Sequence, residues 1–286
     1  MIVAQSPSRW FSTGGRGGGV LAAWCSAQIF AWLWAWVGLR TLGAPLETRP
    51  EGALALLGEG GRLAMDYAAL QQNTLRLYGE ATALMVAAWW LAWLFLGGAF
   101  AAMGTAAVAP TVHRAVVEAA RRFKSLLAIE LVTVLAMGLS VGLGWYGWRY
   151  LDRVDAGLVD AQRADLRHGA VVLGAAVLFA LVRCWRDVAV AFVTGDGRRA
   201  LEAAGDALGA FARRPHRTLG AGLGWALAGW APTALLGLAT VFTEWRAGAA
   251  VVLLMAGVQQ LASWWGYHCR MKWFVSLGEH VLRRRG

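Results

Sequence analysis

Long uncharged apolar stretches alternate with short polar segments along most of the chain. The longest run over residues 17–39, 81–112, 131–148, 218–243 and 247–269. Each has about 18 residues or more, the length at which an apolar segment is expected to cross the hydrocarbon core of a membrane as a helix. A further stretch, 169–182, is shorter and ends at Arg183. The pattern therefore predicts a chain that crosses a membrane several times.

Continuous apolar runs favour helices over a closed β-barrel, whose strands alternate apolar and polar residues over about ten positions. The predicted fold class is all-α, a polytopic membrane bundle of about six transmembrane helices with cytoplasmic amphipathic helices. We expect a disordered tail over 1–19, rich in Ser and Gly, a bundle over 20–270 and a basic cytoplasmic tail over 271–286. The predicted spans are 20–41, 82–108, 127–150, 169–192, 218–243 and 247–269. The first apolar run is longer than that of a signal peptide, so we expect it to be retained.

Composition agrees with a membrane location. Of the 286 residues, 58% are hydrophobic and only 15% are charged, against roughly a quarter charged in soluble globular proteins. The six predicted spans place 18 of the 27 Lys and Arg on one side and nine on the other. The side with more Lys and Arg is normally cytoplasmic, which predicts that both termini are inside. The net charge of +10 then belongs to a rim facing anionic headgroups, and it implies no nucleic-acid partner.

The polar segments contain further helical patterns. In the long outer loop, residues 61–79 have apolar positions near helical spacing, which predicts an amphipathic helix on the outer surface. Residues 152–167 alternate acids and bases, as expected of a solvated helix or turn. On the cytoplasmic side, 114–120 and 199–204 are similar basic amphipathic segments, which suggests repeated helix pairs of one plan.

Glycines spaced four apart occur in two predicted spans, at Gly138 and Gly142 and at Gly220 and Gly224. This spacing lets helix backbones approach closely in lipid, so both pairs are predicted to form packing contacts.

One polar cluster lies within a predicted span. Arg183, Arg186 and Asp187 follow a stretch too short to cross a membrane alone, and Arg183 and Asp187 are four apart on a helix. Ionisable groups at this depth are functional candidates, although arginines near a span end also extend to the headgroups. Glu130, near the inner end of the third predicted span, is the expected partner. We predict a bridge from Glu130 to Arg183 or Arg186.

No motif indicates a reaction. The chain has no phosphate-binding Gly-rich loop, nucleophile elbow or dinucleotide fingerprint. Its three cysteines lie in separate apolar segments, and His113, His216 and His268 lack metal-ligand spacing. We therefore expect no catalytic residues, no cofactor and no metal site, and an enzyme is the less favoured interpretation.

A resemblance adds to this interpretation. The segment Trp93-Leu-Phe-Leu-Gly-Gly98, the helices around Arg114 and Arg199, and the stretch from Asp187 to Asp196-Gly-Arg-Arg199 resemble a loosely defined group of uncharacterised six-helix bacterial membrane proteins. The resemblance covers the second to sixth spans and implies no reaction. Two Lys against 25 Arg suit a bacterium with a GC-rich genome, which makes the inner membrane the expected location.

The leading functional hypothesis is a non-catalytic scaffold, accessory or assembly subunit of a bacterial inner-membrane complex. Its partners would be anionic lipids on the cytoplasmic side and other membrane subunits or a second copy. One alternative is a small permease or channel subunit that works as an oligomer. A weaker alternative is a membrane enzyme that acts on lipid headgroups through outer carboxylates.

Overall fold

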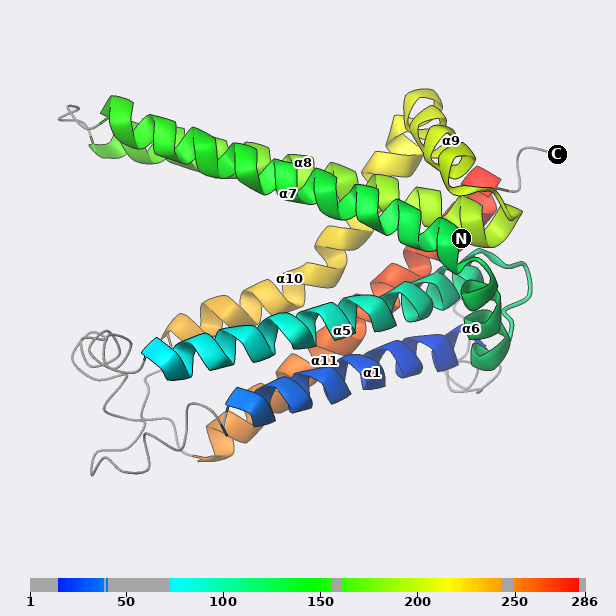
Figure 1. Cartoon of the computed structure of the whole chain (residues 1–286), viewed down its shortest axis with the longest axis horizontal. Helices are drawn as coiled ribbons and strands as arrows, with labels where there is room; N and C mark the ends of the chain where they lie inside the picture. The colour runs from blue at the N-terminus through cyan, green and yellow to red at the C-terminus, as the bar shows by residue number, and fades with distance from the viewer. Residues whose placement is uncertain (1–14, 39, 41–71, 156–160, 243–248, 283–286) are drawn as a thin grey trace, which may run out of the picture. The chain divides into compact units, whose positions relative to one another are not determined.

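The computed structural model describes residues 15–38, 40, 72–155, 161–242 and 249–282, and nearly all of these residues are helical (Figure 1). In these residues there are eight α-helices and no strand, so the predicted all-α class is confirmed. The helices are α1 (Arg16–Gly38), α5 (Gln72–Thr105), α6 (Val112–Arg121), α7 (Phe123–Asp155), α8 (Ala161–Asp196), α9 (Ala200–Arg213), α10 (Ala221–Phe242) and α11 (Ala249–Leu277). Two π-helical turns complete them, η4 (His216–Gly220) and η5 (Gly278–Leu282).

Five of the described helical segments are long and apolar enough to span a membrane: α1, α5, α7, α8 and the segment His216–Gly237 formed by η4 and α10. Their length and composition suggest a multi-pass membrane protein. The helices α5, α7 and α8 have 34, 33 and 36 residues. At ~1.5 Å per residue each is about 50 Å long, which exceeds a hydrocarbon core of roughly 30 Å. Their ends therefore extend past the apolar layer.

The sixth predicted span lies within α11, which is one continuous helix but is not among these five. The count of six spans therefore stays a prediction.

Several predicted boundaries are corrected. Residues 16–19, assigned to the N-terminal tail, form the first turn of α1, and Gly19 is buried. The predicted surface helix at 61–79 falls mainly outside the described residues, but its last part, 72–79, is the beginning of α5. Helical propagation favours this continuity, since nothing between Gln72 and Glu80 breaks the helix.

The C-terminal tail is also corrected. Residues 271–277 continue α11, and 278–282 form η5. Met271, Trp273, Phe274 and Leu277 are buried. Burial of these apolar side chains accounts for an ordered helix where basic composition suggested a tail.

The two segments predicted to be short amphipathic helices are helical, as α6 and α9. In α6, Thr111 caps the N-terminus by accepting a hydrogen bond from the Arg114 N–H at 3.4 Å. In α9, Glu202 accepts from the Arg199 N–H at 3.4 Å. Each buries a stripe of alanines, Ala115 and Ala119 in α6 and Ala203, Ala207 and Ala210 in α9. The order long helix, short amphipathic helix, long helix therefore occurs twice, as α5–α6–α7 and α8–α9–α10.

The chain divides into two compact units, 22–93 and the remainder. In the unit 22–93, parts of α1 and α5 meet through aromatic side chains. Phe30 packs on Trp89 with ring centroids 4.8 Å apart, and Trp34 Nε1 donates to Thr82 Oγ1 at 3.2 Å. Aromatic pairs with a polar group at one end are common in membrane-spanning helices near the headgroups.

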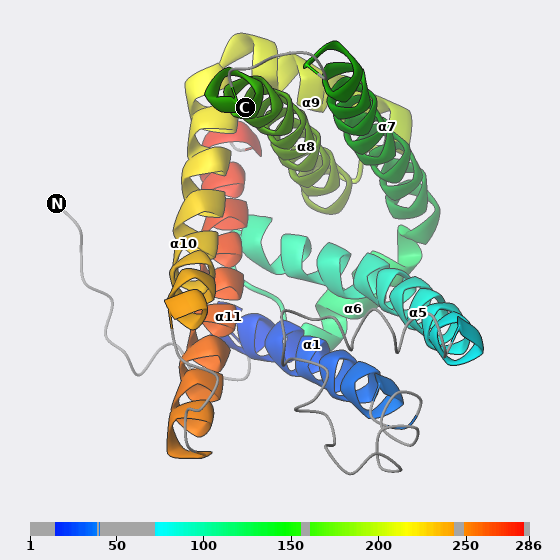
Figure 2. The same cartoon turned by 90° about the vertical axis from the view of Figure 1, so that its left-hand side faces the viewer.

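In the larger unit, α7 lies beside α8 and α10 lies beside α11 (Figures 1 and 2). Glycines set both contacts. A Cβ on Gly144 would lie 2.8 Å from the Cβ of Ala175, and Gly229 of α10 faces Gly266 of α11. Because these positions have no side chain, the helix backbones approach closely.

The predicted glycine pairs are not the ones used. Gly138, Gly142, Gly220 and Gly224 have no other part of the described chain within 4 Å of the position a Cβ would occupy. The prediction that these pairs pack the bundle internally is therefore wrong for the described chain. The contact on α7 lies at Gly144 and Gly147, which face Ala175 and Val171 of α8.

The α7–α8 pair exposes much apolar surface. Leu135 and Leu139 of α7 are 73% and 65% exposed, and Leu173 of α8 is 65% exposed. A continuous apolar surface of this kind is unfavourable in water but ordinary in lipid. It supports membrane insertion of both helices.

Candidate functional site: a buried charge cluster

The predicted polar segment of α8 lies in the most buried part of that helix. From Cys184 to Thr194 almost every residue is buried, and Val188, Ala189, Phe192 and Val193 are completely so. Arg186 and Asp187 are 6% and 5% exposed. These two charges are therefore enclosed by protein on a helix that is long and apolar enough to span a membrane.

Arg186 links α7 and α8. Its Nη2 donates to Glu130 Oε1 of α7 in a close ion pair, and its Nη1 donates to Asp187 Oδ1 at 2.9 Å. The side chains of Arg186 and Glu130 are 7% and 8% exposed. The planar guanidinium thus bonds two carboxylates from two of its nitrogens, a geometry that lysine does not provide.

Arg270 of α11 completes the cluster. Its Nη2 donates to Asp187 Oδ1 at 2.8 Å, and its side chain is 17% exposed. Two carboxylates and two guanidiniums, Glu130, Arg186, Asp187 and Arg270, thus form a neutral chain across α7, α8 and α11. We refer to these four residues as the charge cluster.

The structure separates Arg183 from the other predicted site residues. Its guanidinium lies 5.8 Å from the ring centroid of Trp230 on α10, a cation–π arrangement. Within the described chain it makes no ion pair with Asp187 or Glu130 at 4.0 Å or less. Arg183 and Asp187, four apart on α8, form no ion pair in the described chain, where Asp187 bonds Arg186 and Arg270.

Arg270 is the residue that sequence reasoning missed as a site member. It directly follows the uncharged run 247–269, in the same relation to that run as Arg183 has to 169–182. That parallel was available from the sequence. The contact with Asp187 was not, since it depends on how α11 packs against α8.

Arg122 binds the C-terminal end of α8, near the charge cluster. Arg122 Nη1 donates to the carbonyl oxygens of Val193 and Thr194, the latter at 2.6 Å, and its Nη2 bonds Glu118 at 2.6 Å. A cation at a helix C-terminus interacts favourably with the helix dipole and satisfies carbonyls that lack a partner in the helix. Gly197, with φ of 70°, then turns the chain toward α9.

At the opposite end of α7 and α8, His168 bridges the two helices. Its Nδ1 lies 2.8 Å from the Ala164 carbonyl oxygen and its Nε2 lies 3.0 Å from Asp152 Oδ1. Its ring also packs against Trp148 with centroids 4.4 Å apart. This contact joins the ends of the helix pair.

Within the described residues, no group of three or more His, Cys, Asp and Glu is arranged to hold a metal ion. The three cysteines are free, and Cys184 and Cys269 are buried. In the part of the larger unit that the structure describes, no member of the charge cluster lines any of the three cavities formed by residues of α5, α7, α8, α9, η4 and η5. The cluster's charged groups are therefore directed at one another, an arrangement suited to holding helices together.

Comparison of the chain with protein-family models, with curated proteins and with solved structures finds no match to any of them. Interpretation of the site therefore rests on its own geometry.

Breaking the cluster at one member is expected to cost more than removing a matched pair. Glu130→Ala leaves the buried Arg186 with one carboxylate shared with Arg270, and loss of a buried partner typically destabilises by about 3–5 kcal/mol. The double variant Glu130→Leu with Arg186→Leu retains the neutral Asp187–Arg270 pair and should unfold at a higher temperature than Glu130→Ala. Thermal unfolding in one detergent compares them.

Arg183→Met serves as the matched control, because it removes an arginine of α8 that makes no ion pair within 4.0 Å in the described chain. We expect its unfolding temperature to stay close to that of the wild type. A double variant that is less stable than Glu130→Ala would contradict the assignment of the cluster as a structural joint.

Proposed function

We propose that this chain is a non-catalytic multi-pass protein of a bacterial inner membrane, acting as a scaffold, accessory or assembly subunit of a membrane complex. The observation that carries the proposal is the mutual satisfaction of the charge cluster. Both carboxylates and both guanidiniums bond one another, and the three side chains on α7 and α8 are buried. A catalytic or transport site at this position would instead direct at least one charged group toward a cavity.

The surface of α7 supports a role in assembly. Gly138 and Gly142 have open space beside them, whereas such spacing usually serves close helix contact in membranes. We propose that a transmembrane helix of a partner subunit packs there. The partner helix would then occupy the glycine pair Gly138 and Gly142, which contacts no other helix in the described part of the chain.

The orientation follows from the basic residues. With six spans, including α11, both termini are cytoplasmic, and the short helices α6 and α9 lie along the inner leaflet. The 18-to-nine division of Lys and Arg supports this arrangement. The Arg-rich, Lys-poor composition supports a bacterial source.

Reporter fusions test the orientation. Fusions ending within 156–160 are expected to activate an alkaline phosphatase reporter, which works only outside the cytoplasm. Fusions ending after Arg122 or Arg214 should instead make a green fluorescent protein reporter fluoresce, because those positions follow the inner helices α6 and α9. A cytoplasmic signal from 156–160 would contradict the topology.

Complex formation tests the function. Purified from its native membrane in a mild detergent, the chain should be present in a particle of fixed stoichiometry with another membrane protein, as measured by native mass spectrometry. Gly138→Leu with Gly142→Leu should dissolve this particle while leaving the unfolding temperature nearly unchanged, because the added side chains meet open space in the chain itself.

Gly174→Leu on α8 is the matched control, since Gly174 also has open space beside it, and it should leave the particle intact. A wild-type chain that purifies only as a monomer would contradict the proposal. A chain that alone supports solute flux in reconstituted vesicles would contradict it and favour a permease.

A further inference from the structure

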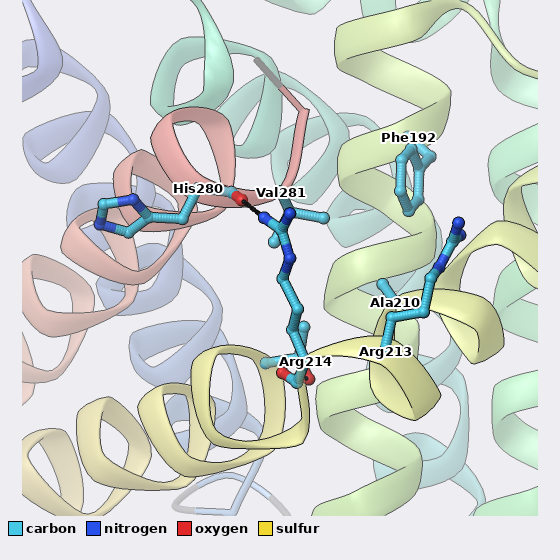
Figure 3. A pocket seen from close by; sticks show the side chains of 7 residues that line it. Phe192, Ala210, Arg213, Arg214, His280 and Val281 are labelled. Atoms are coloured by element: carbon cyan, nitrogen blue, oxygen red, sulfur yellow. Dashed lines mark hydrogen bonds between the residues drawn. The ribbon is translucent and has the colours of Figure 1, made fainter. Parts of the chain in front are cut away.

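A cavity of about 140 Å³ lies where the ends of α9, η4 and η5 meet α8. It is lined by Phe192, Ala210, Arg213, Arg214, Thr218, His280 and Val281 (Figure 3). The volume corresponds to several water molecules at roughly 30 Å³ each, enough for a small polar group with part of its hydration. All of these elements belong to the larger unit.

Two consecutive arginines dominate the cavity. In Figure 3 the two side chains leave the end of α9 in different directions: Arg214 extends toward η5 and Arg213 extends beside α8, while the imidazole of His280 points away from both. Arg214 Nη1 donates to the His280 carbonyl oxygen at 3.3 Å, and Arg213 Nε donates to the Gly209 carbonyl oxygen at 3.0 Å. Each bond uses one of the five donors of a guanidinium. Both side chains are thus held in place with donors remaining.

The charge of this cavity is not balanced by its lining. No carboxylate is among the residues that line it, in contrast to the charge cluster, where Arg186 and Arg270 both bond Asp187. Capping of the α9 carbonyls and of η5 accounts for one nitrogen of each arginine. Capping does not explain why the side chains of two consecutive arginines both line one cavity that has no carboxylate. An anion in the cavity would stabilise this arrangement.

We infer that the Arg213–Arg214 cavity binds a phosphate group. A phosphate offers several acceptor oxygens, and the fork of a guanidinium bonds two of them at once. Two arginines at the C-terminal end of α9 supply more donors than a single carboxylate would use. Thr218 contributes no free donor, because its hydroxyl already donates to the Arg214 carbonyl oxygen at 2.9 Å.

The outer face of α9 indicates the source of the phosphate. Leu201 and Leu208 are 87% and 61% exposed and are seven residues apart, so they lie on one face opposite the buried alanines. A short helix with exposed leucines and flanking arginines is typical of a helix in the membrane interface. An anionic phospholipid, with its acyl chains beside the leucines and its headgroup at the cavity, fits this arrangement better than soluble phosphate.

The inference does not depend on the scaffold proposal, because it concerns the ligand of this cavity alone. The test uses the full chain in a nonionic detergent. Native mass spectrometry measures binding of phosphatidylglycerol, of phosphatidylcholine with the same acyl chains, and of inorganic phosphate in a separate arm. The test variant is Arg213→Gln with Arg214→Gln, and Arg114→Gln with Arg121→Gln on α6 is the control that removes the same charge.

We expect wild-type protein and the α6 control to bind phosphatidylglycerol in preference to phosphatidylcholine. The Arg213–Arg214 variant should bind phosphatidylglycerol roughly tenfold or more weakly, as loss of two charge-assisted contacts implies. Binding of inorganic phosphate with the same loss would support the phosphate site and assign a soluble source. Equal affinity of wild type and variant in both arms, or an equal loss in the α6 control, would overturn it.

A variant with Arg213→Lys and Arg214→Lys guards against misfolding, because it keeps both charges and the long side chains. If the Gln variant unfolds, the Lys variant decides the matter. If the folded Lys variant binds phosphatidylglycerol more weakly than the wild type, the guanidinium groups recognise the phosphate. If it binds phosphatidylglycerol as tightly as the wild type, recognition by the guanidinium groups is rejected.

Discussion

Charges enclosed by protein in a lipid-facing bundle must be paired, and the arrangement of α7, α8 and α11 follows from how this chain pairs them. Arg186 bonds Glu130 of α7 and Asp187 of its own helix, and Asp187 bonds Arg270 of α11. Helix α7 supplies the carboxylate of Glu130 to Arg186, and α11 supplies the guanidinium of Arg270 to Asp187, so each neighbouring helix adds one charge of opposite sign to the pair on α8. An unpaired buried charge would lower the stability of the folded state. The charge cluster therefore holds the three helices in one relative position, and the buried residues around it on α8 are mostly small and apolar.

Three of the settings in which the described arginines occur differ in what balances their charge. In the charge cluster, arginines are enclosed and neutralised. At Arg122 the guanidinium bonds the last carbonyls of α8 and Glu118 of α6. At Arg213 and Arg214 it lines a cavity without a carboxylate. The first two settings stabilise helix contacts and ends, while the third leaves donors for a ligand. Positive charge on these residues is therefore partly structural, and the last setting is the one to which we assign an external ligand.

The sequence predicted the helical class and the neighbourhood of the cluster, because long apolar runs and a charge within a span have few physical solutions. Arg186, Asp187 and Glu130 were found this way. Arg270 could not be found, and Arg183 could not be distinguished from Arg186 as the partner of Glu130, since the sequence specifies spacing along a helix but not which helix packs on which face. The glycine spacing failed for the same reason: Gly144 and Gly147, not Gly138 and Gly142, face α8. The tail at 271–282 was misassigned because basic composition outweighed the buried apolar residues that hold it.

The charge cluster couples α8 to α11 through the ion pair of Asp187 with Arg270. A double-mutant cycle on these two residues measures the free energy of this coupling. The unfolding free energies of Asp187→Leu, Arg270→Leu and the double variant are measured in the same detergent against the wild type. We predict that the unfolding free energy of the double variant exceeds, by about 1–3 kcal/mol, the value expected from adding the two single effects. Additive effects, within about 0.5 kcal/mol, would contradict it.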